Sequence, residues 1–164
     1  MTILSLDLET TGLTIGYHDV IQIGAVALND LGLATTVKFG RKLHIRHPDR
    51  VQAGVLGKYN YYDEATWARE AVDAAQGWRE FCDWVFHCSH GGAVKPRLLG
   101  HNIGKFDYPM SEAWIKFYGL TLHHDYHLID TVTLFNSFKK RARIDRWGCK
   151  MDDVCAVLGF KNPK

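Results

Sequence analysis

Hydrophobic and polar residues follow two different periods along this chain, and the change between them predicts the order of strands and helices. Apolar runs of strand length precede a Thr-Thr-Gly turn at 10–12 and occupy 20–28 and 34–43. Apolar residues at helical spacing then occupy 63–72 and 77–86. Three successive strands with short connections are expected to form an antiparallel meander.

The second half of the chain alternates short strands with helices. A strand is expected at 97–102 before a helix over 102–120, and another at 127–131 before a helix over 131–140. A final amphipathic helix is expected over 150–160. Its inward positions would be Met151, Val154, Cys155 and Leu158. This order predicts an α/β fold, a mixed five-stranded sheet flanked by helices, in which the fourth and fifth strands run parallel to the first.

Composition and charge limit the class of protein. With 164 residues, 46% hydrophobic and 12% aromatic, we expect a single domain over 1–164. The sequence contains no apolar stretch of about 20 residues and enters a strand pattern at its start, so we expect a cytoplasmic protein without a membrane partner. The formal charge of +2 does not indicate a nucleic-acid partner. Basic residues gather at 41–50 and 138–150, where solvated loops and phosphate-binding tracks are both open interpretations.

Two acidic residues, Asp7 and Glu9, interrupt the first apolar run. Residues two apart in a strand point to the same face, so both carboxylates project together from a strand that its leucines would bury. Their repulsion costs free energy unless a cation or hydrogen bonds compensate, although two solvated acids at a strand end are the alternative.

Asp107 lies early in the helix that follows the fourth strand, so this topology brings it to the same edge of the sheet. Three hard oxygen ligands favour Mg²⁺ or Mn²⁺. For Asp107 alone, favourable charge at a helix N-terminus is the simpler interpretation.

Four segments carry a resemblance to a known family, the DEDD or DnaQ-like 3′-5′ exonucleases. The segment DLETTGL, continued by IQIGAVAL, is similar to the first motif of that family, and HNIGKFDYP is similar to the second. IDTVTLF and KMDDVCAVLGF follow the usual continuation. The resemblance implies a ribonuclease H-like fold and hydrolysis of phosphodiester bonds at 3′ ends of DNA or RNA, with release of nucleoside monophosphates.

The resemblance also assigns roles to individual residues. Asp7, Glu9 and Asp107 would form the catalytic centre and hold two Mg²⁺ or Mn²⁺ ions. The residues that would bind the terminal nucleotide are Thr10, Thr11, Gly12, Leu13, His101, Asn102 and Phe106. The implied substrate is a single-stranded 3′ end, with DNA and RNA both open.

In that family a third motif supplies a His or Tyr general base and a fourth metal-binding Asp on a last helix, and the residues up to Lys164 contain no counterpart. We therefore expect the last helix to be absent and the uncovered apolar surface to favour self-association or a partner chain. Asp130 is the candidate stand-in for the fourth carboxylate. Three interpretations stay open: an exonuclease with an unusual third motif, an impaired relative that binds nucleic-acid ends or a protein, and a different two-metal nuclease.

Overall fold

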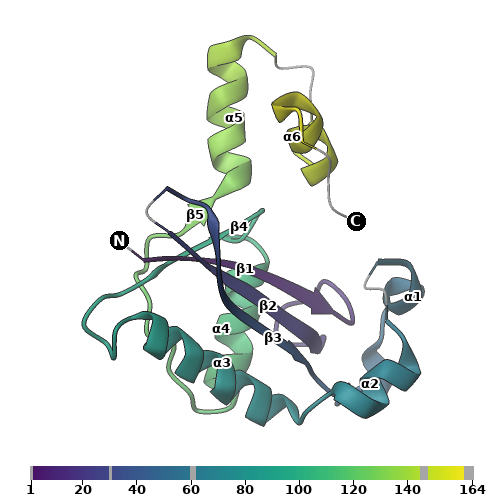
Figure 1. The fold of residues 1–164 in the computed structure, drawn as a ribbon. Helices are drawn as coiled ribbons and strands as arrows, with labels where there is room; N and C mark the ends of the chain where they lie inside the picture. Colours follow the sequence, from purple (N-terminus) through teal and green to yellow (C-terminus); the bar gives the residue numbers. More distant parts are fainter. Residues whose placement is uncertain (1, 30, 60–61, 145–147, 161–164) are drawn as a thin grey trace.

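A five-stranded mixed sheet forms the centre of the molecule in the computed structural model, which describes residues 2–29, 31–59, 62–144 and 148–160 (Figure 1). Its strands are β1 (Ile3–Thr10), β2 (Val20–Leu28), β3 (Ala34–Lys42), β4 (Arg97–Gly100) and β5 (Ile129–Asp130), in the order β3-β2-β1-β4-β5. β1, β2 and β3 form an antiparallel meander, and β4 and β5 run parallel to β1. The predicted mixed sheet is confirmed.

The helices are α1 (Val55–Tyr59), α2 (Glu64–Glu70), α3 (Ala74–Cys88), α4 (Asp107–Phe117), α5 (Thr131–Ala142) and α6 (Met151–Leu158), with a short 3-10 turn, η1 (Pro48–Arg50). The helix predicted over 102–120 begins only at Asp107. Residues 102–106 form turns instead, and Asn102 there has a positive φ of 65°. None of the helices in the described ranges has the length and hydropathy needed to cross a bilayer.

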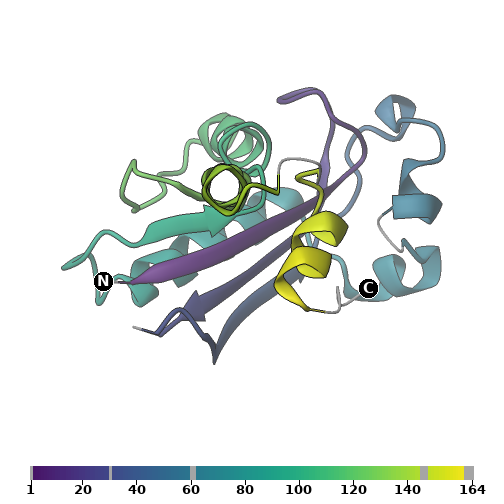
Figure 2. The same ribbon diagram turned by 90° about the horizontal axis from the view of Figure 1, so that it is seen from above.

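Helices α5 and α6 extend from the sheet beyond the β4–β5 edge and lie side by side (Figures 1 and 2). Val154 of α6 is buried and Cys155 is half-buried, but Met151 and Leu158 are 41% and 47% exposed. The prediction that Met151 and Leu158 point inward is therefore wrong. A helix of eight residues resting beside one neighbour buries a narrow stripe only, and the two ends of the predicted apolar face lie outside it.

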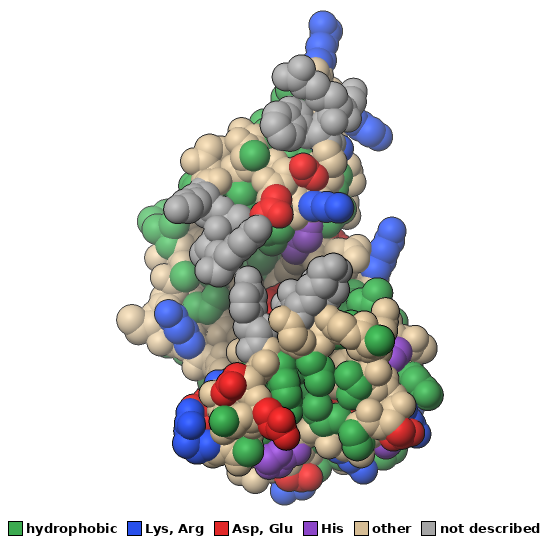
Figure 3. Space-filling view, turned by 90° about the vertical axis from the view of Figure 1, so that its right-hand side faces the viewer, with side chains coloured by type: hydrophobic (Ala, Val, Ile, Leu, Met, Phe, Trp, Pro, Cys, Tyr) green, Lys and Arg blue, Asp and Glu red, His purple; other side chains and the backbone are tan. Residues whose placement is uncertain are grey.

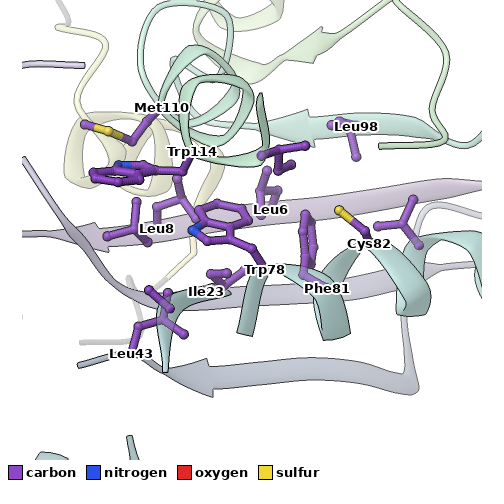
Figure 4. Packing of buried hydrophobic residues seen from close by; sticks show 14 of the residues in the cluster. Leu6, Leu8, Ile23, Leu43, Trp78, Phe81, Cys82, Leu98, Met110 and Trp114 are labelled. Atoms are coloured by element: carbon purple, nitrogen blue, oxygen red, sulfur yellow. The ribbon is translucent and has the colours of Figure 1, made fainter. Parts of the chain in front are cut away.

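One hydrophobic core fills the space between the sheet and helices α3 and α4 (Figure 4). Leu4, Leu6 and Leu8 alternate along β1 and are all buried, which is the period-two pattern of a strand with one face on the core. From the two helices come Trp78, Phe81, Cys82, Val85, Met110 and Trp114. Since the leucines occupy one face of β1, the acidic residues between them must project from the opposite face.

Candidate functional site

Asp7 and Glu9 lie on the half of β1 that extends beyond the end of β4. β1 pairs with β4 only from Ile3 to Ser5, so the later residues of β1 have no strand partner on that side. Asp7 is exposed and Glu9 is half-buried. The sheet therefore presents both carboxylates together at the carboxyl end of its parallel strands, where open α/β sheets bind ligands.

The carboxylate of Asp107 is fixed against this same stretch of β1. Asp107 is the first residue of α4 and is only 5% exposed. Its Oδ1 accepts a hydrogen bond of 3.2 Å from the backbone N–H of Leu8. That N–H is free for Asp107 because β4 has already ended. Leu8 stands between Asp7 and Glu9, so this hydrogen bond holds Asp107, from the start of α4, beside the segment of β1 that carries the other two acids.

Burial raises the pKa values of these three acids, and for Glu9 and Asp107 the charges of neighbouring acids add to it. Burial raises the pKa of Glu9 to about 7, and the charges of Asp7 and Asp107 add to the effect. Burial likewise raises the pKa of Asp107 to about 7, with Asp7 and Asp130 adding and the Leu8 N–H opposing. Protein atoms around the carboxyl group of Asp7 partly desolvate it and also raise its pKa, although the residue as a whole is exposed, and the charge of His101 opposes this shift. The cluster thus holds more negative charge than its surroundings stabilise.

The donor set of this cluster fits a divalent cation of the Mg²⁺ or Mn²⁺ type, because its ligands are hard carboxylate oxygens whose repulsion a cation would relieve. Within the described ranges, no three His, Cys, Asp or Glu side chains are already arranged to hold a metal ion. Binding would therefore draw the carboxylates together. The hydrogen bond from the Leu8 N–H would hold Asp107 in place, so a change of side-chain rotamer at Asp7 and Glu9 is one way to bring the carboxylates together.

Asp130 connects the second candidate motif to α5. Its Oδ1 accepts hydrogen bonds from the backbone N–H groups of Asn102, at 3.0 Å, and Val132, at 2.9 Å. The second bond caps the N-terminus of α5. The charge of Asp130 also reaches Asp107, where it helps to raise the pKa. Asp130 therefore orders the turn that leads to Asp107, and its role as a fourth ligand stays a prediction.

The ring of His101 is held by the residue after Asp130. His101 Nδ1 lies 2.9 Å from Thr131 Oγ1, which in turn lies 3.3 Å from the carbonyl oxygen of Gly100. A hydroxyl has one proton, so both contacts are hydrogen bonds at once only if Thr131 donates to Gly100 and accepts from His101. The imidazole proton is then on Nδ1, and Nε2 is the basic nitrogen.

A cleft of about 380 Å³ opens beside Glu9. Its lining residues are Leu8, Glu9, Thr10, Gly12, Leu13, Gln52, Val55 and Phe106. Four of the predicted nucleotide-binding residues are among them, whereas Thr11, His101 and Asn102 are not. The side of the molecule that carries α1 and α6 is hollowed at mid-height, with acidic and histidine side chains visible in the hollow and hydrophobic ones below it (Figure 3).

The turn at 10–14 shapes one wall of this cleft. A Cβ on Gly12 would lie 2.5 Å from the ring of His18, so only glycine fits there without a shift. Thr11 is fully buried, and its Oγ1 accepts a hydrogen bond from the Asp19 N–H, which makes it an anchor of the turn. Leu13 is 69% exposed at the rim.

Sequence reasoning missed Gln52 and Val55, which also line the cleft. They reach it because the Gln52 N–H donates to the carbonyl oxygen of Thr11 over 2.8 Å. No motif or period in the sequence signals this contact, since it joins two loops through backbone atoms.

No protein-family model and no curated protein matches this sequence. Solved structures do match. The crystal structure of E. coli Exonuclease I with a dT13 oligonucleotide aligns with a TM-score of 0.80 at 13% identity, over 99% of this chain and 36% of that one. The ExoI/SSB-Ct complex aligns with a TM-score of 0.77 at 13% identity, over 99% of this chain and 37% of that one. The zinc-ion-bound form of the E. coli ExoI–ssDNA complex aligns with a TM-score of 0.76 at 13% identity, over 98% of this chain and 35% of that one.

At this identity the likeness establishes the fold. The chain has the ribonuclease H-like α/β architecture seen in exonuclease I, as the resemblance of its motifs implied. It spans about a third of the length of those structures.

Proposed function

We propose that this chain hydrolyses phosphodiester bonds at single-stranded 3′ ends of DNA or RNA and releases nucleoside monophosphates. The observation that carries the proposal is the Asp107–Leu8 hydrogen bond, which holds a third carboxylate beside the stretch of β1 that carries Asp7 and Glu9. The shared fold adds support, since exonuclease I structures include complexes with a dT13 oligonucleotide and with ssDNA.

In this proposal Asp7, Glu9 and Asp107 hold Mg²⁺ or Mn²⁺, two ions in all. Such ions supply an activated water and stabilise the leaving oxygen. Glu9 belongs to the carboxylate cluster and also lines the cleft, so a nucleotide in the cleft has its scissile phosphate beside the acids. Leu13 and Phe106 offer apolar surface to the terminal base and sugar.

A nuclease assay tests the proposal. A single-stranded oligonucleotide labelled at its 3′ end is incubated with Mn²⁺ and wild type, Asp7→Asn or Asp107→Asn. Removing a metal ligand removes several kcal/mol of transition-state stabilisation, so monophosphate release should fall at least ~100-fold. Asp83→Asn on the exposed face of α3 is the matched control and should keep full activity. Binding of the 3′ end without release by any form overturns the proposal in favour of a binding module.

A further inference from the structure

We infer that an aromatic–arginine platform, made of Tyr17, Arg46, Arg50, Phe117 and Tyr118, binds the part of a single-stranded nucleic acid that lies 5′ of the nucleotide in the cleft. This inference rests on the proposed function, because it extends the substrate beyond its terminal nucleotide. The guanidinium carbon of Arg46 lies 5.2 Å from the ring centre of Phe117 and 5.5 Å from that of Tyr118. The guanidinium carbon of Arg50 lies 4.8 Å from the ring centre of Tyr17.

The platform is open to solvent. Tyr17 and Phe117 are 48% and 63% exposed, and Arg46 is exposed as well. Exposed aromatic rings and guanidinium planes are the surfaces on which unpaired bases stack. Bases that stack on these rings and guanidinium planes would bury this apolar surface.

The two arginines differ from their basic neighbours in how they are paired. Arg41 and Lys42 form ion pairs with Glu80 and Glu70. Arg46 and Arg50, in contrast, form no ion pair with any acid in the described part of the chain. Arg46 Nη1 donates to Tyr118 Oη over 2.7 Å, and Arg50 Nη1 donates to the Tyr17 carbonyl oxygen over 3.5 Å. Each guanidinium has five N–H donors, so both keep most of them for phosphate oxygens.

A buried carboxylate holds the platform in place. Asp19 is 3% exposed, and its Oδ2 accepts the backbone N–H groups of Arg46, at 2.8 Å, and His47, at 2.7 Å. Its Oδ1 lies 2.8 Å from the Nδ1 of His47. The backbone N–H of Asp19 donates to Thr11 in the turn that shapes the cleft. The same residue thus fixes the platform and the cleft relative to each other.

The platform continues directly from the cleft. Gln52, which lines the cleft, comes two residues after Arg50, so their Cα atoms lie within about 7 Å. On the other side, Leu13 at the rim and Ile15 are 69% and 43% exposed, and they lead along the loop to Tyr17. A strand whose last nucleotide fills the cleft can therefore pass over this loop onto the two arginines.

Binding measurements in EDTA test the platform without catalysis. The double variant Arg46→Gln/Arg50→Gln is compared with Arg79→Gln/Lys95→Gln, which loses the same charge from exposed positions that form no ion pair within the described ranges. Fluorescence anisotropy with a labelled octathymidylate should show at least ~10-fold weaker binding for the platform variant and less than twofold for the control. Loss of two phosphate contacts should also lower the slope of log Kd against log salt by roughly 1.4. With Mn²⁺, hydrolysis of a dithymidylate should not change.

Equally weakened octathymidylate binding in both double variants would overturn the platform, because the loss of positive charge alone would then explain the weaker binding. A platform variant that fails to fold is recognised by its thermal unfolding curve, and Arg46→Lys/Arg50→Lys then replaces it. The lysine variant keeps the charge but loses the planar guanidinium groups, so unchanged binding of the octathymidylate by this variant would also refute the platform. If the platform variant binds the octathymidylate at least ~10-fold more weakly than wild type but wild type releases no nucleotide with Mn²⁺, the proposed function fails and the platform stands. If wild type releases nucleotides from both the octathymidylate and the dithymidylate, and the platform variant binds the octathymidylate as tightly as wild type does, the platform is refuted and the proposed function stands.

Discussion

Neutralising Asp107 is predicted to stabilise the metal-free protein at high pH. The pKa of Asp107 is raised from 3.8 to about 7, first by burial and then by Asp7 and Asp130. In the unfolded chain the carboxyl group returns to its ordinary value. Between these pH values the folded protein therefore binds more protons than the unfolded chain, so the free energy of unfolding falls as pH rises from about 4 to about 7. Asparagine removes this dependence and can still accept the Leu8 N–H through its Oδ1.

The magnitude follows from the two pKa values. At 1.36 kcal/mol per pKa unit, the difference between the ordinary and the raised pKa of Asp107 lowers the free energy of unfolding at high pH by at most roughly 4 kcal/mol. Asp7 and Glu9 titrate together with Asp107, and water reaches the exposed Asp7, so about half of that, ~2 kcal/mol, is expected. In a chain of this size 1 kcal/mol moves Tm by about 2–4 °C. Asp107→Asn should therefore raise Tm by roughly 4–8 °C at pH 8.

Thermal unfolding followed by circular dichroism in EDTA measures this effect. The gain for Asp107→Asn should be present at pH 8 and shrink towards zero near pH 4, whereas Asp83→Asn should show no such pH dependence. Mn²⁺ should then raise the Tm of wild type at pH 8 and have little effect on Asp107→Asn. An equal Tm for wild type and Asp107→Asn at pH 8, or a gain that persists unchanged at pH 4, would refute the reasoning.

Three further changes test other parts of the structure. Gly12→Ala places a Cβ 2.5 Å from the His18 ring and should cost ~1–3 kcal/mol in urea unfolding, whereas Gly24→Ala, whose Cβ would meet its nearest atom at 3.7 Å, should cost less than ~1 kcal/mol. Thr131→Val removes the hydroxyl that fixes His101, so ¹⁵N NMR of the imidazole should lose the Nδ1–H preference that is expected in wild type, and identical spectra for the two proteins contradict the assignment. Phe81→Ala empties a fully buried position and should cost ~3–5 kcal/mol, against less than ~1 kcal/mol for the half-exposed Phe86→Ala.

Most of the fold could be predicted from local pattern. The apolar run at 20–28 matches the observed β2, whose Val20, Ile21 and Ile23 are buried. The helical spacing over 63–72 matches α2, and Asp63 at the start of that range is its N-cap, since its carboxylate accepts the Thr66 N–H. The placement of Asp107 beside β1 also follows from the sequence, since the parallel topology of β1 and β4 brings their carboxyl ends together.

Features that depend on contacts between distant loops could not be predicted. The period of α6 shows that Met151 and Leu158 share a face with Val154, but not that this helix lies beside α5 and buries only the middle of that face. Gln52 reaches the cleft through one backbone hydrogen bond to Thr11. The basic segment 41–50 likewise divides into ion-paired and ring-stacked residues only once α2, α3 and α4 are in place.

The most direct test of the shared cation is anomalous scattering from crystals of wild type soaked in Mn²⁺. We predict a peak with oxygen atoms from at least two of the Asp7, Glu9 and Asp107 carboxylates at about 2.0–2.2 Å. Density for Mn²⁺ at other positions alone, or none at millimolar Mn²⁺, would contradict the assignment of these three residues as a metal site.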